Sequence, residues 1–67
     1  MGMITQETLR AAFYALSEAM WSDVRQGYIS TAQCRLEHLT ALAEVIDDDW
    51  FSGRIPSYRE TLEEVVV

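Results

Sequence analysis

Residues 30–46, STAQCRLEHLTALAEVI, carry the pattern that most limits how this chain can fold. Apolar residues recur there at alternating spacings of four and three, and the series continues just beyond the segment: Ala32, Leu36, Leu39, Ala43, Ile46 and Trp50. This periodicity is typical of a helix that buries one face. An isolated helix of this length is marginal in water, so its stability must come from packing against another element. The pattern therefore predicts a helix over about 31–47 and a partner for it.

The start of this helix is indicated by Ser30, which Gln33 follows three residues later. The pair matches a capping box, in which the serine oxygen accepts from the backbone N–H of Gln33 and the glutamine side chain reaches back. Ile29 and Cys34 are placed to form a hydrophobic staple around the same cap. We therefore expect Ser30 to be the N-cap.

A second periodic segment supplies the partner. Its apolar residues predict a helix over about 6–26: Leu9, Phe13, Leu16, Met20 and Val24. Thr5 is a favourable N-cap, and Gly27 suits the left-handed residue that often ends a helix. Because the connection between the two predicted helices is so short, they are expected to be antiparallel neighbours.

The C-terminal part of the chain contains two helix-breaking residues. We expect the segment from Gly53 to Pro56 to be a connector. Ser57 and Glu60 then repeat the capping-box pattern and predict a short helix over about 58–65. The sequence thus predicts a single all-α domain spanning residues 1–67, built as an antiparallel helical hairpin plus a short C-terminal helix.

The small size of the domain favours self-association. A chain of 67 residues supplies a core worth only about 3–5 kcal/mol without staples or a second copy. One cysteine excludes an intrachain disulfide. We therefore expect a homodimer that forms a four-helix-type bundle.

The charge balance is acidic and uneven. The formal net charge is −6, every basic residue is arginine, and seven of the eleven acidic residues lie in residues 44–67. The negative electrostatic field of such a chain repels nucleic acid, so we do not expect the protein to bind polyanions in general. The sequence also has no apolar run of about 20 residues that could span a membrane and no basic, apolar start typical of a secretory signal. We expect a cytoplasmic protein with no membrane partner.

Asp47, Asp48 and Asp49 fall at the predicted end of the second helix, where acidic side chains oppose the helix dipole. One of them can cap a turn through Trp50 and Phe51 while the others are solvated. Alternatively, the three form an acidic docking surface or a cation site. A calcium loop of the EF-hand type requires a different order of acids, glycine and glutamate, so no metal is predicted here.

Cys34 and His38 are the residues most suggestive of chemistry, because they are one helical turn apart, a spacing that metal ligands use. Both project away from the side of the helix that carries Leu39. The sequence offers no further ligand, orienting group or substrate cleft for this pair. We predict no metal, no cofactor and no enzymatic activity.

Tyr14, Trp21 and Tyr28 follow one another at intervals of seven, with Arg25 near the same line. Aromatic residues and arginine are enriched at the energetic centres of protein interfaces. The rings either extend the hairpin core sideways, with a cation–π contact from Arg25 to Trp21 or Tyr28, or they form a docking surface.

In layout the predicted hairpin is similar to plasmid copy-number regulators, in which two antiparallel hairpins form a four-helix bundle that binds paired RNA loops. The chain also resembles many small helical proteins that phages and plasmids encode. The first resemblance implies RNA binding through a basic face of a dimer. Arg10, Arg25 and Arg35 are the candidates for that face in the hairpin, and each has acidic residues nearby.

The function that these features favour is that of a small acidic protein-interaction module, acting as a regulator, adaptor or inhibitor of a larger protein. The expected partner-binding residues are Tyr14, Trp21, Arg25, Tyr28, Asp47, Asp48 and Asp49. One alternative is a nucleic-acid mimic in which the three aspartates and the glutamates of residues 60–64 stand in for phosphates. Another is a dimeric helical-bundle regulator that binds nucleic acid.

Overall fold

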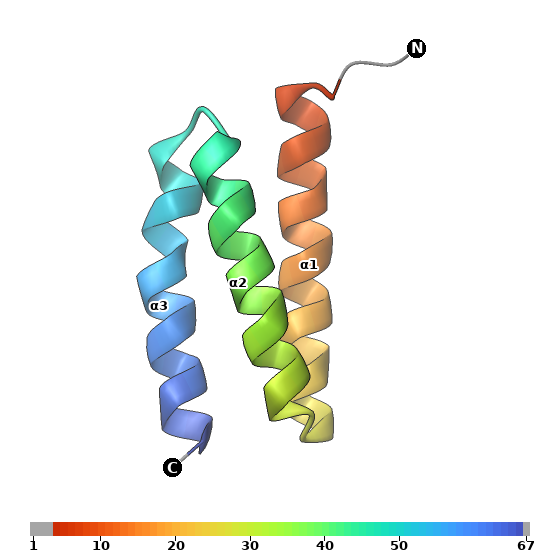
Figure 1. The fold of residues 1–67 in the computed structure, drawn as a ribbon, viewed down its shortest axis with the longest axis vertical. Helices are drawn as coiled ribbons and strands as arrows, with labels where there is room; N and C mark the ends of the chain where they lie inside the picture. The colour runs from red at the N-terminus through yellow and green to blue at the C-terminus, as the bar shows by residue number, and fades with distance from the viewer. Residues whose placement is uncertain (1–3, 67) are drawn as a thin grey trace.

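The computed structural model describes residues 4–66, which form three helices (Figure 1): α1 (Gln6–Gln26), α2 (Ile29–Val45) and α3 (Asp49–Val66). The chain reverses direction at each turn, so α1 and α3 run parallel to each other and antiparallel to α2. α2 lies between the other two helices and makes close backbone contacts with both. The described residues contain no strand, which confirms the all-α prediction.

The sequence predicted the boundaries of α1 correctly. Thr5 caps its start, with the side-chain oxygen accepting from the backbone N–H of Thr8 at 3.1 Å. Gly27 ends it at φ 84°, in the left-handed region. The N–H of Gly27 donates to the Val24 carbonyl at 3.1 Å, and the N–H of Tyr28 donates to the Asp23 carbonyl at 2.8 Å. These two bonds form a Schellman motif, which satisfies the last carbonyls of the helix.

α2 begins earlier than predicted, and the capping box at Ser30 is wrong. The helix starts at Ile29 behind Tyr28, which makes no side-chain capping bond. The Tyr28 carbonyl already accepts the first helical hydrogen bond, from the N–H of Ala32 at 3.0 Å. The Schellman motif therefore leads the chain directly into the new helix, and Ser30 lies in its first turn. At the other end α2 stops at Val45, short of the predicted residue 47.

α3 is the largest departure from the sequence prediction. It begins at Asp49 and contains 18 residues, so the predicted connector from Gly53 to Pro56 is helical and the third helix is not short. An interior glycine costs a helix about 1 kcal/mol and an interior proline about 3 kcal/mol. Burial of Phe51 and Leu62, both 2% exposed, supplies compensating packing energy.

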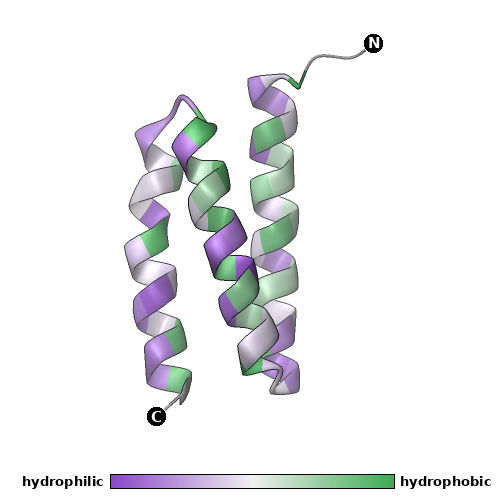
Figure 2. Cartoon of the chain, in the orientation of Figure 1, coloured by the Kyte–Doolittle hydropathy of each residue, from purple (hydrophilic) through white to green (hydrophobic). Residues whose placement is uncertain are grey.

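The core lies where the three helices meet. Phe13, Met20 and Leu39 are fully buried at its centre. The predicted face of the α2 segment is confirmed for five members, all buried: Ala32, Leu36, Leu39, Ala43 and Ile46. Apolar residues alternate with polar ones along each helix (Figure 2), as expected for helices that bury one side. Within residues 4–66, no helix combines the length and apolar character needed to cross a membrane.

Polar contacts fix α1 to α2 near both ends of the pair. Near the Gly27 turn, Nε of Arg35 pairs with Oδ2 of Asp23 at 2.5 Å. At the opposite end, the Gln6 side chain donates to the Val45 carbonyl at 3.1 Å and accepts from the backbone N–H of Asp47 at 2.8 Å. The glutamine therefore joins the start of α1 to the turn between α2 and α3.

Candidate functional site

Aromatic rings join the two outer helices along what we call the aromatic seam. It consists of Phe13, Tyr14 and Trp21 from α1 and Trp50, Phe51 and Tyr58 from α3. The ring centroids are 5.0 Å apart for Phe13 and Phe51 and 5.3 Å apart for Trp21 and Tyr58, both in edge-to-face geometry. Such pairs add about 0.5–1.5 kcal/mol beyond the area that they bury. The rings therefore close the space between α1 and α3 that α2 leaves open.

The register of the seam follows from the parallel orientation of α1 and α3. Tyr14 and Trp21 are seven residues apart on one helix, and Phe51 and Tyr58 are seven apart on the other. Tyr14 packs on Phe51 with centroids 5.6 Å apart, and Trp21 packs on Tyr58 one level further along. The interval of seven residues in both segments is a sequence signal for the pairing of Tyr14 with Phe51 and of Trp21 with Tyr58. It predicts this pairing only if residues 49–57 are helical, which the sequence does not indicate.

One end of the seam reaches the surface as a group that we call the aromatic patch: Tyr14, Trp50 and Arg54. Tyr14 is 51% exposed and Trp50 is 45% exposed, and their ring centroids are 6.1 Å apart. The guanidinium carbon of Arg54 lies 4.7 Å from the Trp50 ring centroid, a cation–π contact. Both rings rest on Phe51, which is buried. The patch is thus an exposed surface with a packed support beneath it.

The acidic run at residues 47–49 lies beside the patch, at the turn that leads into α3. All three side chains are exposed. Asp48 accepts a hydrogen bond from the backbone N–H of Trp50 through Oδ1 at 3.0 Å, and Asp49 is in the first turn of α3. The expectation that one aspartate caps a turn through Trp50 and Phe51 is confirmed. The run follows the C-cap of α2, as expected, but it also leads into the N-terminus of α3, where negative charge is stabilising and offsets the opposition to the α2 dipole.

The structure places Tyr14, Trp21 and Tyr28 in different surroundings, so they do not form one continuous surface. Trp21 is half-buried against Tyr58. Tyr28 is 57% exposed but lies in the turn between α1 and α2, at the opposite end of the molecule from the aspartates. Arg25 is exposed in the last turn of α1. The cation–π contact predicted for Arg25 is found in the described residues at Arg54 and Trp50 instead.

Trp50 and Arg54 are the patch residues that the sequence did not indicate. Their spacing of four residues would place them on one side of a helix. The apolar periodicity, however, places Trp50 in the buried series of the second helix, and Arg54 falls within the expected connector from Gly53 to Pro56. Both assignments depended on the boundary between α2 and α3.

Cys34 and His38 lie one helical turn apart on α2, as the sequence predicts. Both side chains are exposed on α2. Among the residues that the structure describes, no group of three or more histidine, cysteine, aspartate or glutamate side chains is arranged to hold a metal ion. Within residues 4–66 the fold therefore brings no third ligand to the pair.

The aromatic patch and the adjacent aspartates together form the candidate interaction surface. It offers two aromatic rings, a guanidinium group held against one of them, and carboxylates a few residues away. Comparison of the chain with protein-family models, curated proteins and solved structures gave no match.

Proposed function

We propose that this chain is a small acidic protein-interaction module that acts as a regulator, adaptor or inhibitor of a larger protein, with the aromatic patch as its contact surface. The observation that carries the proposal is the pairing of Tyr14 with Trp50, both about half exposed although they pack on one another. Tryptophan, tyrosine and arginine dominate the binding energy of protein interfaces. Rings that are already held in place lose little conformational entropy when a partner binds.

The charge beside the patch indicates the chemistry of the partner. Asp47, Asp48 and Asp49 border Trp50, and the chain carries a net charge of −6. The complementary surface is an apolar hollow with lysine or arginine at its edge. Charges at such an edge act mainly on the association rate and make it sensitive to salt. Binding of this partner is therefore expected to weaken as the salt concentration rises.

The homodimer expected from the size of the chain also belongs to this proposal, with a four-helix-type contact made by α1 and α3 of each copy. The exposed rings of the patch support it, because a two-fold axis would set the same surface of each copy against the other. Two copies each carrying −6 repel one another. Self-association is therefore expected to strengthen with added salt, which screens that repulsion. The two modes of binding are thus distinguished by opposite responses to salt.

A photo-crosslinking amino acid at position 50 tests the proposal. We expect crosslinks to one larger protein and to a second copy of the chain in cells that produce it, and neither when the crosslinker is placed at Tyr28, which is also exposed but lies at the other end of the molecule. Light scattering over a range of salt concentrations then measures the mass of the free chain. Equal crosslinking from both positions would contradict the assignment of the patch.

A further inference from the structure

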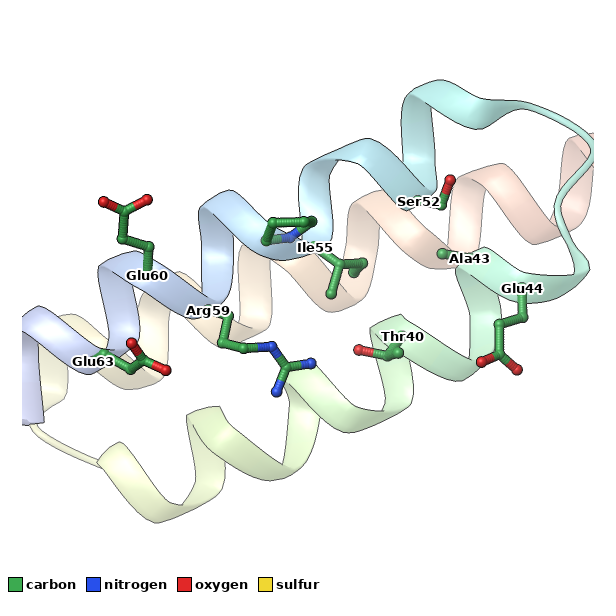
Figure 3. Close-up of a pocket in the computed structure, with 9 residues that line it drawn as sticks. Thr40, Ala43, Glu44, Ser52, Ile55, Arg59, Glu60 and Glu63 are labelled. Carbon is green, nitrogen blue, oxygen red and sulfur yellow. The ribbon is translucent and has the colours of Figure 1, made fainter.

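A groove lies between α2 and α3 (Figure 3). Its volume is about 500 Å³. Ala43 and Ile55, which are buried, form its apolar floor, and the exposed Pro56 lies beside them. A second hollow of about 260 Å³ adjoins it and shares Arg59 and Glu63 with it, so the groove continues along the crevice between the two helices. An elongated hollow of this kind suits a linear occupant.

The groove exists because large and small side chains are divided between two sides of α3. Phe51 and Tyr58 pack toward α1 as part of the aromatic seam. The opposite side of α3 presents Ser52 and Pro56, which face Thr40 of α2 across the crevice. Two residues along a helix correspond to a rotation of about 200°, which separates Ser52 from Trp50 of the patch. The groove and the patch are therefore distinct surfaces.

The rims of the groove are acidic. Glu44 from α2 and Glu60 from α3 lie on opposite rims, and Glu63 lies further along (Figure 3). Glu37 lines the adjoining hollow. Arg59 extends from α3 toward α2 and makes no ion pair within the described residues. Four glutamates against one arginine give the groove a negative potential, which a basic occupant would neutralise.

We propose that this groove binds a basic amphipathic helix of another protein. The apolar side of that helix would cover Pro56 and the apolar floor beside it, and its lysine or arginine residues would reach Glu44 and Glu60. Grooves of this type recognise helices through apolar anchors three and four residues apart. A second copy of this chain is a poor occupant, because its net charge of −6 opposes that of the glutamates. This site goes beyond the proposed function, which places partner binding on the other side of α3.

The test uses a defined probe, an 18-residue helical peptide with leucines along one side and lysines on both flanks, and measures its affinity by calorimetry. The groove variant is Glu44→Lys with Glu60→Lys. The matched control is Glu18→Lys with Glu64→Lys, which changes the net charge equally at exposed positions outside the groove. We expect the groove variant to lose at least about tenfold in affinity, corresponding to about 1.4 kcal/mol, and the control to lose less than about threefold.

Two further measurements show whether the probe binds at the groove and whether binding depends on the order of its residues. Amide chemical shifts should change along α2 and α3 at the groove, and a peptide of the same composition with scrambled order should bind at least about tenfold more weakly. Equal losses in the two charge variants, or equal binding of the scrambled peptide, would overturn the proposal. The variant Tyr14→Ser with Trp50→Ser should still bind the probe. The test of the groove is therefore independent of whether the aromatic patch binds a partner.

Discussion

The carboxylate of Asp48 accepts a hydrogen bond from the backbone N–H of Trp50 at 3.0 Å. This contact connects two features of the molecule. It satisfies one of the unpaired N–H groups at the start of α3. It also fixes the backbone of Trp50, whose ring packs against Tyr14 and is 45% exposed. One acidic residue thus begins a helix and supports the proposed interaction surface.

Replacing that cap should destabilise the fold. Asp48→Ala removes the side-chain acceptor at the start of α3, and loss of such a cap costs about 1 kcal/mol. Urea unfolding followed by circular dichroism measures the change in the free energy of unfolding. Asp47→Ala is the matched control, because Asp47 contributes its backbone N–H rather than its side chain to the hydrogen bond with Gln6. Equal stability of the two variants would contradict the capping role of Asp48.

The two described glycines within or beside helices should respond to alanine in opposite directions. Gly27 has φ 84°, so Gly27→Ala should destabilise the protein by about 1 kcal/mol. Gly53 lies inside α3 with open space where the methyl group of an alanine would be, so Gly53→Ala should stabilise it by about 0.5–1 kcal/mol. Thermal unfolding of both variants measures the signs. A destabilised Gly53→Ala variant would contradict a continuous α3.

The ion pair between Asp23 and Arg35 should contribute to the docking of α1 on α2. The side chain of Asp23 is 12% exposed and that of Arg35 is 35% exposed, so solvent screens the pair only in part. A double-mutant cycle with Asp23→Asn and Arg35→Gln should give a coupling energy of about 1 kcal/mol. A coupling energy near zero would show that the two side chains do not interact in solution.

Ser17 offers a site for stabilisation. It is 7% exposed, and its hydroxyl oxygen has no hydrogen-bond partner among the described residues. Ser17→Ala removes a buried polar group that lacks a partner and improves helix propensity, so the variant should be more stable by about 1 kcal/mol. Ser22→Ala serves as a comparison, because the Ser22 hydroxyl accepts from the Gln26 side chain at 3.1 Å. Chemical denaturation should rank Ser17→Ala as the more stable of the two.

Those parts of the fold where local and long-range signals agree were predictable from the sequence. In α1 the cap at Thr5, the apolar periodicity and Gly27 all indicate the same boundaries, and the structure has them. At Ser30 a local capping signal competed with the Schellman motif at Gly27, and the motif determined where α2 begins. In α3 the local preferences of Gly53 and Pro56 opposed a helix. The packing of Phe51 against Phe13, a contact distant in sequence, outweighed them.

The candidate site was predictable only in part for the same reason. Tyr14 and the aspartates were recognised from residue type and spacing, whereas Trp50 and Arg54 were hidden by an incorrect helix boundary. The groove between α2 and α3 depends on which side of α3 faces α1. That orientation is determined by the aromatic seam, so it could not be derived without the three helices in place.

The most direct test of the central claim is the affinity of the crosslinked partner, once purified, for three forms of the chain. Calorimetry compares the wild type with Tyr14→Ser/Trp50→Ser and with Tyr28→Ser/Val65→Ser, the latter removing two exposed apolar residues outside the patch. We predict that the patch variant loses about 30-fold or more, as for interface residues worth about 2 kcal/mol or more, while the control binds like the wild type. Wild-type affinity in the patch variant would contradict the account.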